Sequence, residues 1–597
     1  MKKIIKYLFL LTGGSFILAS CNDFLDREPL DSVTPDNFFF TENDLAAYAV
    51  KHYNFRTHEG FNAGIWKNDN ATDNQAATDY DKKWIPGQWK VPEAYDNPAS
   101  NDPWYFSAIR EANYFLETVV PRFEKGEIEG SETNIKHYIG EMYFLRAKNY
   151  LSKLETFGDF PIIKNTLPDE SASLIQASKR EPRHKVARFI LEDLDLAIGL
   201  LTNTISGGKN RITQNAALLL KSRAALYEAS WLTYHKGTAL VPGGPGWPGK
   251  AEDIADFNID TEIAFFLKEA KAAAKEVIGN AALVQNTAKD CMDETVKTDE
   301  DKYKMSNPYF AQFSANSLEG YSEILLWRAY NLLDYKIVHS APFYIRVGGN
   351  TGFTRQYVES FLCRDGKPIY ATDQYKGDES LSDVRKNRDL RLQLFLMTSG
   401  ETLSPNVMNG TPDLLPEVPQ LLDITEKRCV TGYQVRKGLS GNWYRDGNTA
   451  IEGCPVYRVA EAYLNYIEAD CMEHNGTSIG SEAAGYWGDL RERAGLPRDY
   501  TVTVNNTDLS KELDWAVYSA GKTVSPLLYN IRRERRCELL AEGLRMLDLK
   551  RWRALDQVKQ FVIQGVNLWE SDLKDKYMQD GKNLLIQEGT EGQTSNV

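Results

Sequence analysis

Apolar residues recur at helical spacing in several long segments, and this repetition constrains the fold more than any other feature of the sequence. Ile139, Tyr143, Ala147 and Tyr150 follow one another at intervals of three or four residues. That spacing places them on one face of a helix. We therefore predict a helix over residues 135–157.

The same periodicity predicts five further helices, at 42–56, 105–120, 186–201, 217–231 and 263–277. Thr261 is a plausible N-cap of the last helix, and Gly279 a plausible C-terminal stop. The helices come in pairs joined by short polar or glycine-bearing links, as in a helix-turn-helix solenoid of tetratricopeptide (TPR) type, although no clean 34-residue period survives. The predicted fold class is therefore mainly α.

Long irregular segments separate the helices, at 57–104, 232–260, 281–325 and 340–455. They are rich in Gly, Pro, Asn and Asp, but also in Trp and Tyr, which disordered segments lack. Ordered loops of this length are usually functional. We expect a helical solenoid that supports long irregular loops with minor β hairpins.

Charge and hydropathy exclude two classes of protein. The 70 Lys and Arg against 83 Asp and Glu give a net charge of −13, a field that repels phosphate backbones, so no nucleic-acid partner is expected. The mean hydropathy is −0.45, and the one apolar stretch suited to a membrane is at the extreme N-terminus. A multi-pass membrane protein is therefore excluded.

The N-terminus has the features of a secretory leader. Three lysines precede the apolar run Leu8 to Leu18, and Ala19-Ser20-Cys21 follows. This end resembles a bacterial lipoprotein lipobox, and the run is short for a spanning helix of roughly 20 residues. We predict a signal peptide over 1–20 and a mature chain that begins at an acylated Cys21 and is anchored to a membrane without spanning it.

Several blocks resemble the SusD/RagB family of Bacteroidetes outer-membrane lipoproteins. The most specific is Ile531-Arg-Arg-Glu-Arg-Arg-Cys-Glu-Leu539, followed by Glu542-Gly-Leu-Arg545 and Arg551-Trp552. Earlier blocks are Cys21-Asn-Asp-Phe-Leu-Asp26, Gly140-Glu-Met-Tyr-Phe-Leu-Arg-Ala147 and Tyr457-Arg-Val-Ala-Glu-Ala-Tyr-Leu464, in the order that the family shows.

The resemblance implies about four TPR units and a protein that is not an enzyme. It implies an N-terminal region over 21–340 and a C-terminal region over 341–597, packed as one globular unit. Family members sit at the cell surface, bind glycans or in some cases peptides, and form a lid over a SusC-like TonB-dependent transporter. We therefore expect a glycan-binding lipoprotein that delivers oligosaccharide to such a transporter. A peptide-binding member and a surface glycoside hydrolase are the alternatives.

The loop over 57–104 supplies most of the candidate ligand residues. Pro86 and Gly87 favour a type II turn between Trp84 and Trp89, which a hairpin would place side by side as a platform for sugar rings. Equally, both indoles could pin the loop to the helices, since type II turns fit hairpin twist poorly. The full candidate set is Trp84, Trp89, Trp66, Tyr80, Tyr95, Asp79 and Asp81 from this loop, and Tyr309 and Trp443 from later loops.

No cofactor is expected, with calcium left open. Asp69, Asp73, Asp79 and Asp81 offer hard oxygen ligands, but they lack EF-hand spacing. A solvated loop, or hydrogen bonds from sugar hydroxyls, is the interpretation that the pattern favours.

An acidic row at Glu534, Glu538 and Glu542 could mimic a pair of glycosidase carboxylates. Arginines close to it in sequence favour a different role. We predict a structural ion-pair network with no catalytic function, formed by Arg535, Glu538, Glu542, Arg545 and Asp548. The sequence contains neither H-E-x-x-H nor G-x-S-x-G.

Overall fold

A computed structural model of the chain describes residues 38–79, 104–287, 307–334, 336–398, 402–404, 413–414, 418–440, 448–558 and 562–585. The predicted signal peptide and Cys21 lie outside these ranges. None of the described helices is long and apolar enough to cross a membrane.

The N-terminal half is a stack of antiparallel helices. It contains α2 (Glu42–Lys51), α3 (Ser107–Glu124), α4 (Glu132–Phe157), α5 (Ser171–Ala177), α6 (Arg183–Leu200), α7 (Gln214–His235) and α8 (Ile259–Asn280). From α3 onward each long helix packs on the next, α3 on α4, α4 on α6, α6 on α7 and α7 on α8. This is the TPR-like solenoid that the apolar periodicity predicts.

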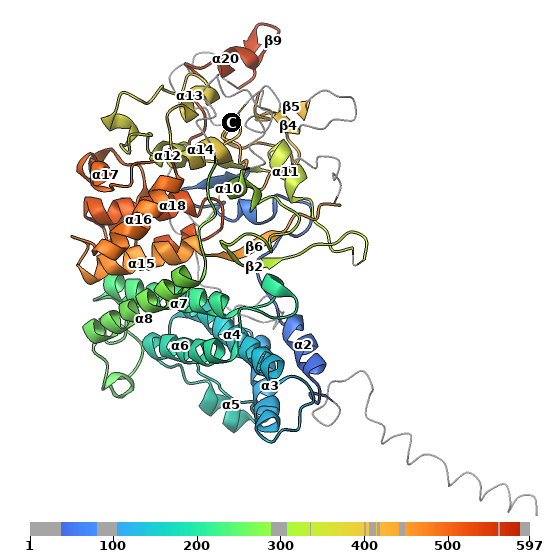
Figure 1. The fold of residues 1–597 in the computed structure, drawn as a ribbon. Helices are drawn as coiled ribbons and strands as arrows, with labels where there is room; N and C mark the ends of the chain where they lie inside the picture. The colour runs from blue at the N-terminus through green and yellow to red at the C-terminus, as the bar shows by residue number, and fades with distance from the viewer. Residues whose placement is uncertain are drawn as a thin grey trace, which may run out of the picture.

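The C-terminal half continues the stack. Its longer helices are α15 (Ala460–Glu473), α16 (Ser481–Arg493), α18 (Pro526–Glu538) and α19 (Arg545–Arg551), with α17 (Thr501–Asn505) beside α18. Helix α15 packs on α8 and α7 of the first half and on α16 and α18 of the second, so one apolar core runs through both halves. Figure 1 shows α15, α16 and α18 lying between the N-terminal stack and a region of short elements.

That third region holds loops and short helices. The helices are α10 (Pro308–Ala311), α11 (Ala341–Val347), α12 (Arg355–Ser360), α13 (Leu381–Arg385), α14 (Leu390–Phe395) and α20 (Leu573–Lys576). Single 3-10 turns add η1 (Gly64–Lys67), η5 (Ile369–Ala371), η7 (Leu509–Lys511) and η8 (Trp515–Val517), while η3 (Gly208–Asn210) and η4 (Ala251–Ile254) connect helices of the N-terminal half. A second apolar core, rich in aromatic rings, lies beneath the short helices.

Within the described residues the strands form five antiparallel pairs. Two pairs join distant parts of the chain: β1 (Gln75–Ala77) with β3 (Thr351–Phe353), and β2 (Ile324–Arg328) with β6 (Cys454–Arg458). The remaining pairs are β4 (Thr402–Ser404) with β5 (Asp413–Leu414), β7 (Tyr518–Ser519) with β8 (Lys522–Thr523), and β9 (Met578–Gln579) with β10 (Lys582–Asn583). The minor β structure is therefore present.

All six predicted helices are confirmed, with two corrections at the ends of α8. Asn258, not Thr261, caps the helix, because its side chain accepts hydrogen bonds from the backbone N–H groups of Asp260 and Thr261. Gly279 lies inside the helix, which ends at Asn280. The segment 340–455 is also less irregular than expected, since it contains α11 to α14.

The predicted network is present, and it is larger than expected. Glu538 is fully buried and accepts hydrogen bonds from Arg391 (3.1 Å), Arg458 (2.7 Å) and Arg493 (2.7 Å). Burial by itself raises the pKa of Glu538, but the three guanidinium groups hold this pKa below its ordinary value.

The other four predicted residues also form ion pairs and hydrogen bonds with oppositely charged side chains. Arg535 donates to Asp548 at 2.8 Å, the one direct pair among the five predicted residues. Glu542 accepts from Arg458 and Lys437, and Arg545 donates to Asp73 and Asp514. Most partners come from distant segments, so the network joins the C-terminal helices to the loops as well as to one another.

We predict that Glu538→Ala lowers the free energy of unfolding by about 3–5 kcal/mol, because it leaves buried arginine charge uncompensated. Urea denaturation at pH 7 measures this. Glu192→Ala is the matched control: Glu192 is solvent-exposed and pairs with Lys164 across 3.6 Å, a contact worth about 1 kcal/mol or less. Equal losses in the two variants would contradict a structural role for the network.

Candidate functional site

Two loops that are far apart in sequence, residues 56–64 and 328–341, meet at their bases. The hydroxyl of Tyr330 donates to the backbone carbonyl of His58 at 2.8 Å. The ring of His339 lies 4.7 Å from the ring of His58 and 4.5 Å from that of Tyr330, measured between centroids. Three buried rings thus hold the two loops together.

Both imidazoles are neutral and hold backbone groups. His58 Nδ1 accepts from the N–H of Ile65 at 3.2 Å, and His339 Nδ1 accepts from the N–H of Ala341 at 3.1 Å. His339 Nε2 lies 2.9 Å from the carbonyl of Glu452, which makes this nitrogen the donor. Burial, and then neighbouring His339, lowers the pKa of His58 well below 6.5, and burial also lowers the pKa of His339.

Beyond their bases the two loops expose apolar side chains. Phe61 is 66% exposed and Leu333 is 86% exposed, while Leu332 and Ile337 are about two-fifths exposed. We call these four side chains the loop surface. Singly exposed apolar residues are ordinary, but four on two joined loops make this surface a candidate binding face.

A third loop reaches the same place. His339 exchanges backbone hydrogen bonds with Ala450, and the hydroxyl of Ser340 donates to the Asn448 side chain at 3.2 Å. The candidate Trp443 precedes Asn448 by five residues and lies outside the described part of the chain. The described segment that begins at Asn448 therefore lies beside the base of the loop over 328–341.

Two of the predicted ligand residues belong to the core. Trp66 is 1% exposed and packs edge-on against Phe313, with ring centroids 5.8 Å apart. Tyr309 is fully buried, its hydroxyl donates to Glu538, and the Arg493 guanidinium lies 4.4 Å from its ring centre. Neither ring is accessible to a sugar, so we reassign both from the ligand surface to the interior.

Of the remaining candidate ligand residues, the structure describes one and does not describe the other five. Asp79 is exposed, two residues beyond the end of β1. Trp84, Trp89, Tyr80, Tyr95 and Asp81 lie outside the described residues.

Two of the four aspartates for which the sequence favours a solvated loop, Asp69 and Asp73, are buried. Asp73 accepts from Arg545 at 2.7 and 2.8 Å and lies 3.2 Å from the Arg536 guanidinium, while Asp69 is buried and accepts from Asn74. The expectation of solvent exposure is therefore wrong for these two residues. The described residues contain no group of three or more His, Cys, Asp or Glu side chains that could hold a metal ion.

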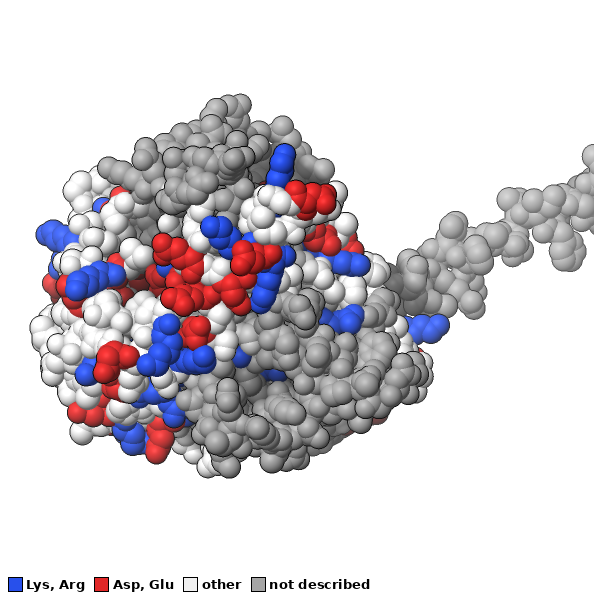
Figure 2. Space-filling view, turned by 90° about the horizontal axis from the view of Figure 1, so that it is seen from above, with Lys and Arg blue, Asp and Glu red and all other residues white. Residues whose placement is uncertain are grey.

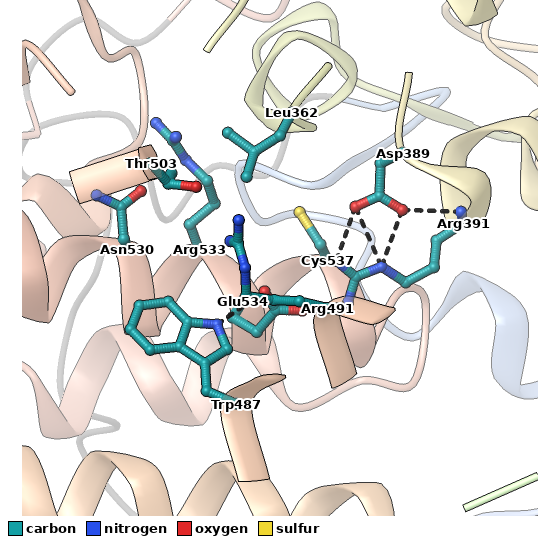
Figure 3. A pocket seen from close by; sticks show the side chains of 10 residues that line it. All are labelled: Leu362, Asp389, Arg391, Trp487, Arg491, Thr503, Asn530, Arg533, Glu534 and Cys537. Atoms are coloured by element: carbon teal, nitrogen blue, oxygen red, sulfur yellow. Dashed lines mark hydrogen bonds and ion pairs between the residues drawn. The ribbon is translucent and has the colours of Figure 1, made fainter. Parts of the chain in front are cut away.

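The acidic row offers no room for a substrate. Glu534 accepts from Arg391 at 2.5 Å and from the indole N–H of Trp487 at 3.0 Å. The neighbouring cavity, shown in Figure 3, measures about 10 Å³, which is space for one water molecule. Its carboxylates are already bound by protein donors, so this part of the row is structural.

Sequence reasoning missed the residues that build the loop surface. Phe61 lies in the segment 57–104, which the sequence predicts to be a functional loop. Nothing in the residues around Phe61 distinguishes it as a ligand residue. Most of residues 328–341 lie between the predicted loop segments 281–325 and 340–455. The Tyr330–His58 hydrogen bond and the ring contacts, which no sequence spacing indicates, bring the two loops together.

We predict that acid weakens the joint between the loops. A histidine whose folded pKa is depressed contributes full stability above its unfolded pKa of about 6.5 and loses it as pH falls below that value. Between pH 7.5 and 5 the wild type should lose more free energy of unfolding than the variant His58→Gln/His339→Gln, by up to about 1.4 kcal/mol per pH unit for each histidine. Parallel urea-denaturation profiles for the two proteins would contradict this.

Comparisons with known proteins give the family. The family model described as "SusD family" matches residues 296–595, and one described as "Starch-binding associating with outer membrane" matches residues 23–226. SusD-like protein P2 of Formosa agariphila is 27% identical over 557 residues, which cover 91% of this chain and 89% of that protein.

Solved structures show the same fold. A SusD-like protein from Bacteroides fragilis aligns with a TM-score of 0.59 at 21% identity, over 89% of each chain. A SusD-like carbohydrate-binding protein from the same organism aligns with a TM-score of 0.58 at 18% identity, over 90% of this chain and 91% of that one. The SusD-family match covers half of the chain, including residues 328–341 and the buried network around Glu538, and on this basis the protein belongs to the SusD family.

Proposed function

We propose that the protein is a lipid-anchored, non-catalytic receptor of the outer membrane that captures oligosaccharide at the cell surface and passes it to a SusC-like TonB-dependent transporter. The observation that carries the proposal is membership of the SusD family. The description of the N-terminal match as starch-binding and associating with the outer membrane supports both the ligand class and the location. The lipobox at Cys21 supplies the anchor.

The loop surface is the part of the described structure best suited to a glycan. Sugar rings present C–H faces that stack on aromatic rings, and Phe61 offers such a ring to solvent. Trp84, Trp89, Tyr80, Tyr95 and Trp443, which lie outside the described residues, stay predicted as further aromatic contacts with the sugar. Asp79 and Asp81 would then accept hydrogen bonds from hydroxyls.

One observation favours the peptide alternative. Three of the four side chains of the loop surface, Leu332, Leu333 and Ile337, are aliphatic, and aliphatic pockets suit peptide side chains better than sugar rings. No such observation favours a glycosidase, because arginines bind the row around Glu538.

The surface charge agrees with a neutral ligand and disfavours nucleic acid. Figure 2 shows basic and acidic side chains interspersed on the described part of one face, with acidic residues gathered in a central band. A phosphate backbone requires a continuous basic surface. The visible part of this face has none.

We predict that Trp84→Ala/Trp89→Ala weakens binding of the cognate oligosaccharide by at least about 1 kcal/mol, a rise of roughly fivefold in Kd, because it removes aromatic contacts with the sugar. Affinity electrophoresis and calorimetry of the full-length lipoprotein against plant, fungal and host polysaccharides measure this.

Tyr105→Ala is the control, since Tyr105 is an aromatic residue with 40% exposure at the start of the N-terminal stack. A double variant that is folded and binds normally would remove these tryptophans from the site. Tight binding of peptides with no binding of glycans would replace oligosaccharide by peptide as the ligand, and release of reducing sugar would refute the non-catalytic assignment.

A further inference from the structure

A second cavity lies beside α18, and none of its lining residues belongs to the loop surface. It is formed by α12, η5, η7, η8 and α18, and it measures about 40 Å³, which is room for about three water-sized groups. It is larger than the 10 Å³ cavity beside Glu534, and Arg533 lines both. We call it the Arg533 cavity.

The inner wall of the Arg533 cavity carries hydrogen-bonding groups without partners. Arg533 is 3% exposed, and its Nη2 donates to Glu512 and to the hydroxyl of Tyr529. Its Nη1 and Nε have no hydrogen-bond partner among the described residues, and neither does Oε1 of Gln356, whose Nε2 donates to the carbonyl of Val562. The wall therefore presents a spare donor and a spare acceptor.

Leaving such groups unpaired is unfavourable. A buried donor or acceptor without a partner costs about 1–3 kcal/mol. Arg533 lines both cavities but Gln356 lines only the larger one, so the larger cavity is where a single group could meet both residues. That partner must accept a hydrogen bond from Arg533 and donate one to Gln356.

The charged groups around the cavity leave no place for a cation. Each lining carboxylate already has its own donor: Glu359 has Arg355 at 2.7 Å, Glu512 has Arg533 and two tyrosine hydroxyls, and Asp514 has Arg536 and Arg545. A cation therefore finds no free carboxylate. An anion would meet Lys511 and Arg533 as well as Glu359 and Glu512, but an ionised carboxylate has no donor for the Gln356 acceptor, which a hydroxyl supplies.

The rim adds an apolar contact. Leu513 is 56% exposed at the mouth, and Pro368 and Ile369 line the wall next to it. Tyr370 has its hydroxyl bound to Glu512, which fixes the orientation of its ring at the cavity. A ligand here meets polar atoms at the base and apolar atoms at the mouth.

We propose that the Arg533 cavity is a second carbohydrate subsite, which takes a hydroxyl-bearing edge of a neutral sugar. One hydroxyl oxygen accepts from Arg533 and donates to Gln356, and the C–H face of the ring rests against Leu513 and Tyr370. The volume admits a hydroxymethyl group and a neighbouring hydroxyl, while the rest of the ring stays at the mouth. The choice of a sugar over another neutral alcohol rests on the proposed function.

The test uses the full-length protein and ligand-observed NMR with methyl glycosides of glucose, galactose and xylose, and with glucuronate. We expect at least one neutral glycoside to bind with a millimolar Kd and glucuronate to bind more weakly. Leu513→Glu should raise the Kd of the neutral glycoside at least fivefold, because it replaces the apolar rim by a charge. Leu240→Glu, at a leucine that is 54% exposed on another loop, should leave it unchanged.

Gln356→Leu provides a second variant, which removes the spare acceptor and should have the same effect as Leu513→Glu if its melting temperature is retained. Binding of no neutral glycoside at 50 mM, equal binding of glucuronate, or an unchanged Kd in Leu513→Glu would each overturn the proposal.

The Trp84→Ala/Trp89→Ala variant separates this subsite from the main one. It should keep the glycoside binding that Leu513→Glu weakens. If the wild type binds no polysaccharide but still binds the glycoside in a Leu513-dependent manner, the proposed function fails while the subsite stands.

Discussion

Burial of arginine–carboxylate pairs along α18 is the constraint on which the rest of the structure depends. Glu538 lies between Arg391 from α14, Arg458 from the end of β6 and Arg493 from the end of α16. Removing charges from water is costly, and the attraction between them offsets that cost only when every donor and acceptor is matched. These segments, distant in sequence, must therefore converge in one arrangement, because any other would leave a charge buried alone.

The same principle extends the influence of α18 to the loops. Arg536 of α18 and Arg545 of α19 both hold Asp73, and Arg536 also holds Asn74. Asp73 and Asn74 come directly before β1, which pairs with β3, a strand far away in the sequence. The base of the long N-terminal loop is thus fixed by charge from the C-terminal helices. A loop fixed at its base can vary at its exposed end without disturbing the fold, which is how ligand-binding loops are usually supported.

Helices and the network were predictable from the sequence, for different reasons. Helix α4 follows from the spacing of Ile139, Tyr143 and Ala147, because apolar periodicity is a local property of the chain. The residues of the network follow from the charge pattern around Glu538, but most of their partners do not, since Arg391, Arg458 and Asp73 are distant in sequence. Where the chain folds back on itself, sequence spacing carries no information about distance. The joint between His58 and His339 was missed for this reason.

Trp66 and Phe61 show why residue type alone did not locate the site. They are five positions apart in one loop, and the larger aromatic is the better candidate for stacking on a sugar. Yet η1 turns Trp66 inward against Phe313, where Gly438 leaves room for it: a Cβ at Gly438 would lie 2.0 Å from the indole nitrogen. Phe61 precedes that turn and faces solvent. The backbone turn between the two residues, together with Gly438, more than 370 residues away, determines which ring is buried and which is exposed. A ligand surface made of loops is therefore defined by such long-range contacts, whereas the solenoid beneath it is already encoded in local periodicity.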